Sequence, residues 1–189
     1  MTIATTEEIL DFWFSDEVQP KWFNSDDAFD KEIKKDFLST YENMPKNIDD
    51  ILKGTPEDVL AAIIVFDQFP RNIFRGKKKA YGTDEIALKI ASESIKRKLD
   101  RNMDDQQRKF LYMPYMHSED IKDQRSCIAL LGRTKDEEAM KHALQHKETI
   151  LRFGRFPHRN EILGRKSTDI EIKYLAKLKE LASVAEDAA

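Results

Sequence analysis

Apolar side chains recur along this chain at the three- and four-residue spacing of amphipathic helices. Phe29, Ile33, Phe37 and Leu38 share one helical face, for example, and polar residues fill the positions between them. No stretch shows the alternation of apolar and polar residues, bounded by turn residues, that is typical of hairpin strands. The pattern therefore predicts an all-α protein.

Residues that cap helix N-termini divide this pattern into eight or nine predicted helices. A hydroxyl or carboxylate side chain precedes each apolar stretch, often with Glu or Asp in the first turn. The predicted N-terminal residues are Thr5, Ser25, Thr55, Thr83, Asp104, Ser118, Thr134 and Thr168. The helix after Thr55 is apolar on nearly every side, so we expect it to be the most buried element.

Length and charge indicate one globular domain over residues 1–189, with a frayed tail at 183–189. Hydrophobic residues make up 40% and charged residues 35% of the 189, enough for a sizeable core. A net charge of −3 argues against a nucleic-acid partner. The apolar run at 59–66 is too short to cross a membrane, and residues 1–8 resemble no secretory signal, so we expect a cytoplasmic protein.

Several chemical classes find no support in the sequence. Cys127 is the one cysteine, so no intrachain disulfide can form, and its apolar neighbours predict a core position. The aromatic residues Trp13, Phe14, Trp22 and Phe23 are likewise expected in the core. There is no glycine-rich phosphate loop and no GxSxG nucleophile motif. We expect no cofactor.

Three apolar–proline steps, at Pro70, Pro114 and Pro157, stand 44 and 43 residues apart. Each follows an apolar helical segment, and the residue before proline disfavours helix, so each step predicts a helix end or kink. Such a period suits stacked helical pairs, although three points also fit chance. Local sequence also repeats, with FPRN at 69–72 and FPHRN at 156–160.

Charged residues cluster at these steps, and we predict that they form the functional site. Arginine binds phosphate and carboxylate groups in a two-pronged geometry, and histidine transfers protons near neutral pH. The predicted ligand-binding residues are Arg71, Asn72, Arg75, Arg152, Arg155, Arg159, Asn160 and Arg165. The predicted proton-transfer residues are His117 and His158, and the predicted acidic partners are Asp67, Glu119 and Asp120.

Simpler interpretations of the same residues remain open. Asp67 could terminate its helix by pairing with Arg71 or Arg75, and Ser118 with its two acids could only cap a helix. A metal site could be assembled from His117, Glu119, Asp120, His146 and His158. The surrounding arginines would repel a divalent ion, so we predict no metal. An anion fits them better.

Four segments together resemble one bacterial family. They are LDFWF at 10–14, DQFPRNIFRG at 67–76, FLYMPYMHSED at 110–120 and RFGRFPHRN at 152–160, with LGR and ST following. The chain, from about residue 7 to residue 178, is similar to the family catalogued as domain of unknown function 924. The resemblance implies a tetratricopeptide-like helical array. It brings no reaction or ligand, and the chain lacks the 34-residue tetratricopeptide consensus.

Three functional hypotheses follow. The first is a pocket for a small anionic molecule, bearing phosphate or carboxylate, in an enzyme or a binding protein. The second is a helical groove that captures an acidic or C-terminal peptide by its carboxylate. In the third, the charged residues only join the helices. The first requires Arg71, His117 and Arg159 to lie close together in one cleft. The oligomeric state stays open.

Overall fold

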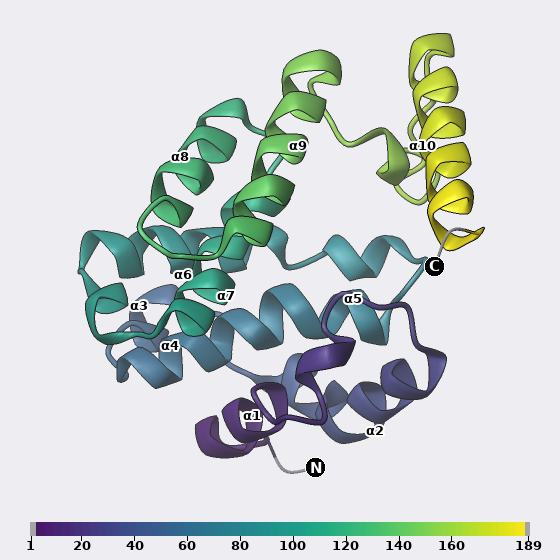
Figure 1. Ribbon diagram of the computed structural model, residues 1–189. Helices are drawn as coiled ribbons and strands as arrows, with labels where there is room; N and C mark the ends of the chain where they lie inside the picture. Colours follow the sequence, from purple (N-terminus) through teal and green to yellow (C-terminus); the bar gives the residue numbers. More distant parts are fainter. Residues whose placement is uncertain (1–2, 188–189) are drawn as a thin grey trace.

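The computed structural model describes residues 3–187, with side chains through Leu181. Of the tail predicted to fray, 183–187 are helical and 188–189 lie outside the described residues. Figure 1 shows the helical arrangement. The α-helices are α1 (Thr6–Trp13), α2 (Asp27–Asn43), α3 (Ile48–Ile51), α4 (Pro56–Ile63), α5 (Phe69–Ile73), α6 (Asp84–Lys96), α7 (Asp105–His117), α8 (Ile121–Leu131), α9 (Glu137–Phe153) and α10 (Asp169–Asp187). Shorter elements are η1 (Gln19–Lys21), η2 (Ile64–Gln68), η3 (Lys78–Tyr81), η4 (Leu99–Asn102) and η5 (Pro157–Arg159).

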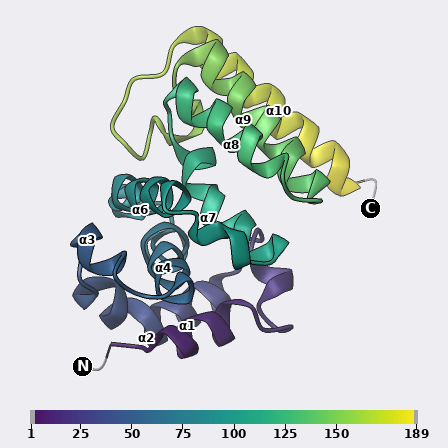
Figure 2. The same ribbon diagram turned by 90° about the vertical axis from the view of Figure 1, so that its left-hand side faces the viewer.

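The prediction of an all-α single domain is confirmed. Because α4, η2 and α5 run on without a break, residues 3–187 form nine helices, and no strand occurs among them. Figure 2 shows them in layers, with α1 and α2 at one end, α4 next, α6 and α7 above it, and α8, α9 and α10 at the other end. No helix in this part of the chain is long and apolar enough to span a bilayer.

The core is centred on the helix predicted to be most buried. Each residue from Val59 to Phe66 is 2% exposed or less. Trp13 is also fully buried, and Cys127 lies in the same core. Phe23 differs from expectation, because 66% of it is exposed.

Helix N-termini follow the predicted chemistry, with corrections of one or two residues. Thr5 and Thr55 form capping boxes with Glu8 and Asp58. The predicted caps Ser25, Ser118 and Thr134 are wrong, since Asp26, Asp120 and Asp136 accept the N–H bonds instead. Thr83 occupies the N-cap position of α6 as predicted, although its side chain makes no capping hydrogen bond.

The three proline steps differ from one another in structure. Pro70 lies in α5 directly after η2, a π-helical turn, and Pro114 lies inside α7, so neither residue ends its helix. Pro70 has no N–H to donate to the carbonyl of Phe66, four residues earlier. The buried Thr83 hydroxyl donates to that carbonyl instead, at 2.6 Å. Pro157 opens η5 after α9 has ended at Gly154, whose φ of 68° favours glycine.

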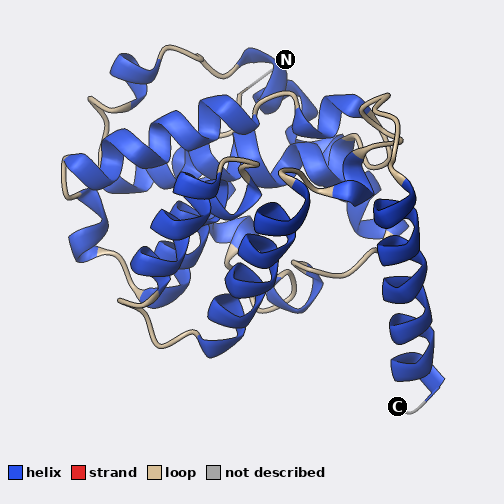
Figure 3. Cartoon of the chain, turned by 90° about the horizontal axis from the view of Figure 1, so that it is seen from above, coloured by secondary structure: helices blue, strands red, loops and turns tan. Residues whose placement is uncertain are grey.

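The last helix, α10, lies to one side of the others (Figure 3). Side-chain hydrogen bonds and ring contacts attach it. Arg155 donates to both Glu171 carboxylate oxygens, at 2.7 and 2.8 Å. The hydroxyls of Thr149 and Tyr174 are 3.1 Å apart, which joins α9 to α10.

Candidate functional site

Asp67 is the centre of a buried polar network. It lies in the π-helical turn η2 and is 0% exposed. Its Oδ1 accepts a hydrogen bond from Arg71 Nη2 at 3.1 Å and lies 2.8 Å from His117 Nδ1, and the neighbouring Gln68 amide donates to its Oδ2. A buried carboxylate requires such donors, and here three side chains provide them.

Asp84, the first residue of α6, brings a third segment into this network. Arg71 Nη2 donates to Asp84 Oδ1 at 2.9 Å, and Arg159 Nη1 lies 3.7 Å from Asp84 Oδ2. Arg159 Nη1 also donates to the His117 carbonyl at 2.9 Å. Arg71, His117 and Arg159 lie close together as predicted, but not in the predicted cleft. They meet inside packed protein, and Arg159 is only 6% exposed.

The charges in this network nearly cancel. Burial alone would raise the pKa of Asp67, but His117 and Arg71 outweigh it and hold that pKa well below its usual range. Burial and the positive charge of Arg71 lower the pKa of His117 despite the opposing attraction of Asp67. Burial raises the pKa of Asp84. At neutral pH we therefore expect an ionised Asp67 beside a neutral imidazole.

Arg159 is enclosed more by aromatic rings than by acceptors. Its guanidinium carbon is 4.5 Å from the centre of the Phe156 ring and 4.8 Å from that of Tyr81. Its Nε is buried without a hydrogen-bond partner, and so is the Nε of Arg71. Two buried N–H groups without acceptors leave this network incompletely satisfied.

Three other predicted arginines pair with carboxylates, and two predicted asparagines support them. Arg75 and Asn72 both donate to Asp30 of α2, at 2.7 Å and 2.9 Å. Arg155 pairs with Glu171, and Arg165 Nη1 donates to Glu119 at 2.6 Å. Asn160 accepts from Arg165 Nε at 3.0 Å. These contacts fit the third hypothesis, in which the charged side chains only join the helices.

The predicted acidic partners have three different roles. Asp67 pairs with Arg71 rather than Arg75. Glu119 accepts from Arg165 and from the Phe156 N–H, the latter at 2.7 Å. Asp120 caps α8 by accepting from the Lys122 N–H, and pairs with no arginine among the residues whose side chains are described.

A cavity of about 690 Å³ lies between α9 and α10, and we call it the α9–α10 cavity. Its lining includes Arg152, His146, His158, Tyr174 and Lys177. The Arg152 guanidinium lies over the rings of Phe153 and Tyr174, at 4.9 and 5.6 Å. Of the predicted arginines, Arg152 is the one without an ion-pair partner among the described side chains.

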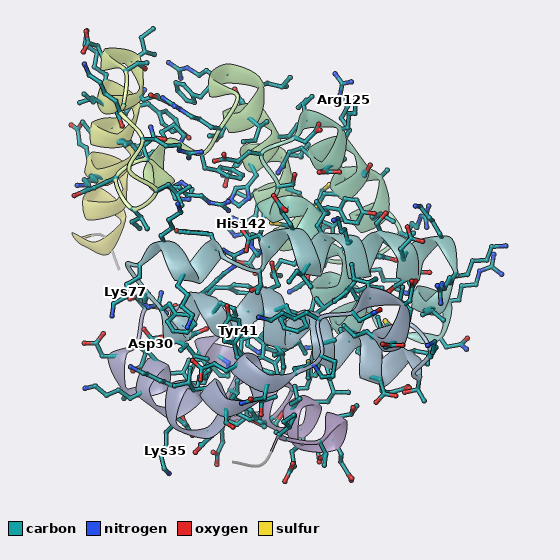
Figure 4. The ribbon with its side chains drawn as sticks, turned by 180° about the vertical axis from the view of Figure 1, so that it is seen from behind. Asp30, Lys35, Tyr41, Lys77, Arg125 and His142 are labelled. Atoms are coloured by element: carbon teal, nitrogen blue, oxygen red, sulfur yellow. The ribbon has the colours of Figure 1, made fainter. Side chains whose placement is uncertain are left out.

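A second cavity of about 280 Å³, the α7–α9 cavity, adjoins the buried network. It is lined by Phe23, by Lys109, Met113, Met116 and His117 of α7, and by Glu138, Ala139, His142 and His146 of α9. Figure 4 shows His142 in the region between these two helices. His117 and His146 therefore connect the charged residues to space that a ligand could enter.

The imidazoles of His117 and His146 have the same hydrogen-bond arrangement. The Nδ1 of each faces an acceptor, Asp67 at 2.8 Å and the Met116 carbonyl at 3.2 Å, so Nδ1 carries the proton. Burial lowers the pKa of His146 to about 4. Each Nε2 therefore offers a lone pair. No three His, Cys, Asp or Glu side chains are placed to hold a metal ion in the described part of the chain.

Sequence reasoning missed several residues of this region. The sequence places Asp84 in the first turn of one predicted helix and Glu171 in a capping box with Thr168, and it does not single out Asp30, Tyr81 or Lys177. Asp84 receives Arg71 and approaches Arg159 only because three segments pack together. The one local signal for Tyr81 was an aromatic residue near a cluster of arginines, since guanidinium groups stack on rings.

Comparisons with known proteins give a family and a fold. The family model described as "Bacterial protein of unknown function (DUF924)" matches residues 9–178. A solved structure titled as a protein of unknown function, ATU0120 from Agrobacterium tumefaciens, is 37% identical, covering 91% of this chain and 97% of that chain, with a TM-score of 0.84. No curated protein matches the sequence. Neither description names an activity.

Proposed function

The chain belongs to this family of bacterial proteins of unknown function, and we propose that it binds a small anionic molecule in the α9–α10 cavity. One observation carries the proposal. Arg152 and Lys177 line that cavity without an ion-pair partner among the described side chains, whereas the other predicted arginines are neutralised by carboxylates. An unpaired arginine on an aromatic surface can donate two parallel hydrogen bonds to phosphate or carboxylate.

The remaining lining of the cavity is compatible with an anion. His146 and His158 both have a lowered pKa, because burial and nearby positive charge disfavour their protonated forms. Neutral imidazoles do not repel Arg152, so the anion meets its charge at Arg152 and Lys177 alone. Glu148, which also lines the cavity, opposes binding. Proposed ligands therefore carry one compact anionic group that can avoid this carboxylate.

The tetratricopeptide-like array that the family resemblance implies belongs to the same proposal. Its support is that successive helices from α6 to α9 each pack against the next. In such arrays the groove between helical pairs commonly holds a ligand or peptide. A peptide that ends in a free carboxylate is thus the alternative occupant of the α9–α10 cavity.

A second candidate function is proton transfer by His117. Its Nδ1 faces the buried Asp67 carboxylate, which fixes the ring orientation and leaves Nε2 at the α7–α9 cavity. A histidine oriented in this way accepts a proton in many enzymes. His158, the other predicted proton-transfer residue, has a ring 5.5 Å from Phe156 and no carboxylate partner among the described side chains. We therefore assign this role to His117.

Thermal shift with a panel of anions tests the binding proposal. Inorganic phosphate, acetate and small phosphorylated or carboxylated metabolites are each added to the intact chain. An anion at 100 times its Kd should stabilise the fold by about 2.7 kcal/mol, a rise of roughly 5–10 °C in Tm. We expect Arg152→Gln and Lys177→Gln to abolish the rise while leaving the unliganded Tm unchanged.

Arg125→Gln provides the matched control, because Arg125 is exposed on α8 and points away from α10 (Figure 4). We expect it to bind as the unchanged protein does. No Tm shift with any anion, or an equal loss in Arg125→Gln, would contradict the proposal. A peptide with a free C-terminus that binds where the amidated peptide does not would identify the groove alternative instead.

A further inference from the structure

The α7–α9 cavity shares the lining residue His146 with the proposed anion site but differs from it in chemistry. Phe23, Met113, Met116 and Ala139 give it a mainly apolar lining. An apolar cavity of about 150 Å³ is large enough to bind benzene. With a volume of about 280 Å³, this cavity can hold an aromatic ring with several further atoms. Methionine sulfur and phenylalanine rings both make favourable contacts with an aromatic ligand.

The inner polar groups of this cavity are neutral or already paired. Lys109 forms an ion pair with Asp136 at 2.5 Å. His117 and His146 donate through Nδ1 to Asp67 and to the Met116 carbonyl. Their Nε2 atoms are therefore acceptors, and neither has a hydrogen-bond partner among the described residues. Glu138 and His142 line the cavity as exposed residues, so their groups remain in contact with water.

These features call for a ligand of one chemical class. An anionic ligand would lose its hydration without gaining a free positive charge, because Lys109 is already paired. A cationic ligand would find only Glu138, whose carboxylate is exposed to water. A hydrocarbon would leave the His117 and His146 lone pairs without donors once water is displaced. A ring that carries one hydroxyl satisfies both conditions, because its apolar part contacts the sulfur and aromatic side chains and its O–H donates to an imidazole.

We propose that the α7–α9 cavity is a binding site for a small uncharged aromatic alcohol, whose hydroxyl donates a hydrogen bond to His117 Nε2. The two sites share one lining residue, His146, but the proposed hydrogen bond is to His117, which does not line the α9–α10 cavity. The site therefore does not depend on an anion being bound. If His117 transfers protons, this hydroxyl is the group from which it would accept one. Binding itself, however, requires only the lone pair and the apolar surface.

The test compares two probes of the same shape, 4-methylphenol and 1,4-dimethylbenzene, by NMR titration of the intact chain. 4-Methylphenol carries a hydroxyl group where 1,4-dimethylbenzene carries its second methyl group. We expect 4-methylphenol to bind about five- to tenfold more tightly, the effect of one additional hydrogen bond of ordinary strength. Equal affinities would overturn the role of His117, and no binding of either probe at millimolar concentration would overturn the site.

Two variants locate the site without disturbing the buried network. Ala139→Leu adds a side chain to the cavity wall, so both probes should lose at least tenfold in affinity. Ala129→Leu makes the same change on the exposed face of α8 and should bind as the unchanged protein does. If Ala139→Leu, verified as folded by circular dichroism, retains full affinity, the proposal is wrong.

His117→Phe should remove the preference for 4-methylphenol while retaining 1,4-dimethylbenzene. Since this change leaves Asp67 without one donor and could unfold the chain, the Ala139→Leu result decides the site independently. Phosphate titrated into the same samples separates the two proposals. Phosphate binding without 4-methylphenol binding would overturn only this inference, and the reverse result would overturn only the anion site.

Discussion

Two segments with nearly the same sequence, FPRN at 69–72 and FPHRN at 156–160, meet at one carboxylate through different backbones. The first lies in a continuous helix directly after a π turn, and the second forms a short 3-10 helix between α9 and α10. Arg71 and Arg159 nevertheless both approach Asp84, at 2.9 and 3.7 Å. Similar sequence here predicted a common meeting point without predicting a common local structure.

The two arginines differ in what surrounds them. Arg71 contacts two carboxylates, Asp67 and Asp84. Arg159 has one distant carboxylate, one carbonyl and two aromatic rings. Burial lowers the pKa of Arg159, whereas the two carboxylates raise that of Arg71 despite burial. A buried guanidinium thus contributes to stability according to its partners and not according to its motif.

The phenylalanines differ in the same way. Phe69 packs against Phe37 and Trp13, with ring centres 4.6 and 5.7 Å away, deep in the core. Phe156 packs against His146 and His158, at 5.0 and 5.5 Å. The Phe69 ring is therefore packed against rings that do not titrate, and the Phe156 ring against two histidines. This contrast leads to three predictions about stability.

The largest effect is expected from Arg71→Met. Methionine keeps most of the apolar contact of the arginine stem, but Asp67 and Asp84 lose their shared cation. Breaking a buried ion pair in this way costs roughly 3–5 kcal/mol. Urea unfolding at neutral pH measures the loss, and an unchanged slope with denaturant shows that the two states are still comparable.

Arg75→Met is the matched control for this change, because Arg75 lies one turn later and pairs with Asp30 at a more exposed position. An exposed ion pair is worth about 0–1 kcal/mol, so this variant should remain near the stability of the unchanged chain. Equal losses in the two variants would contradict the central role of Arg71.

Arg159→Met is expected to cost less, about 1–2 kcal/mol. The variant removes the hydrogen bond to the His117 carbonyl and the contacts with two rings, but Asp84 keeps Arg71. It also removes the unpartnered buried Nε of Arg159. The same urea experiment compares it with Arg71→Met. If Arg159→Met costs as much, the sequence similarity of the two segments reflects equal energetic roles after all.

Local chemistry explains which features could be predicted from sequence. The caps at Thr5 and Thr55 depend on residues within one helical turn, and both helix starts were predicted correctly. Ser118 and Asp120 are equally good caps in isolation. The structure selects Asp120, and the Ser118 hydroxyl donates to Asp123 at 2.6 Å instead. That choice depends on side-chain geometry, which local sequence does not specify.

Packing between distant segments decided the rest of the candidate site. Arg152 and Arg155 are three residues apart and looked equivalent in sequence. Arg155 pairs with Glu171 because α10 returns alongside it, whereas Arg152 stays unpaired among the described side chains. The meeting of Arg71, His117 and Arg159 was predictable from three similar steps along the chain. Their shared carboxylate, Asp84, was not, because nothing in its own segment distinguishes it from other first-turn acids.

The smallest expected effect is a difference between the two segments in how they make the free energy of unfolding depend on pH. Burial lowers the folded-state pKa of His146, which packs on Phe156, to about 4, against about 6.5 in an unfolded chain. Between these values the unfolded chain binds more protons, so the free energy of unfolding rises with pH from 4 to 6.5 and His146 adds no further dependence above 6.5.

We expect His146→Gln to remove part of this rise, about 1–2 kcal/mol between pH 4.5 and 6.5, since the partial exposure of the ring weakens the effect. Urea unfolding of both proteins at several pH values measures it, and the difference between them cancels the contribution of the carboxylates. His158→Gln should remove less, because the His158 side chain is exposed, and solvent weakens the effects of its surroundings and of Arg159 that lower its pKa. If His158→Gln reduces the pH dependence of the free energy of unfolding more than His146→Gln does, the assignment of this dependence mainly to His146 is wrong.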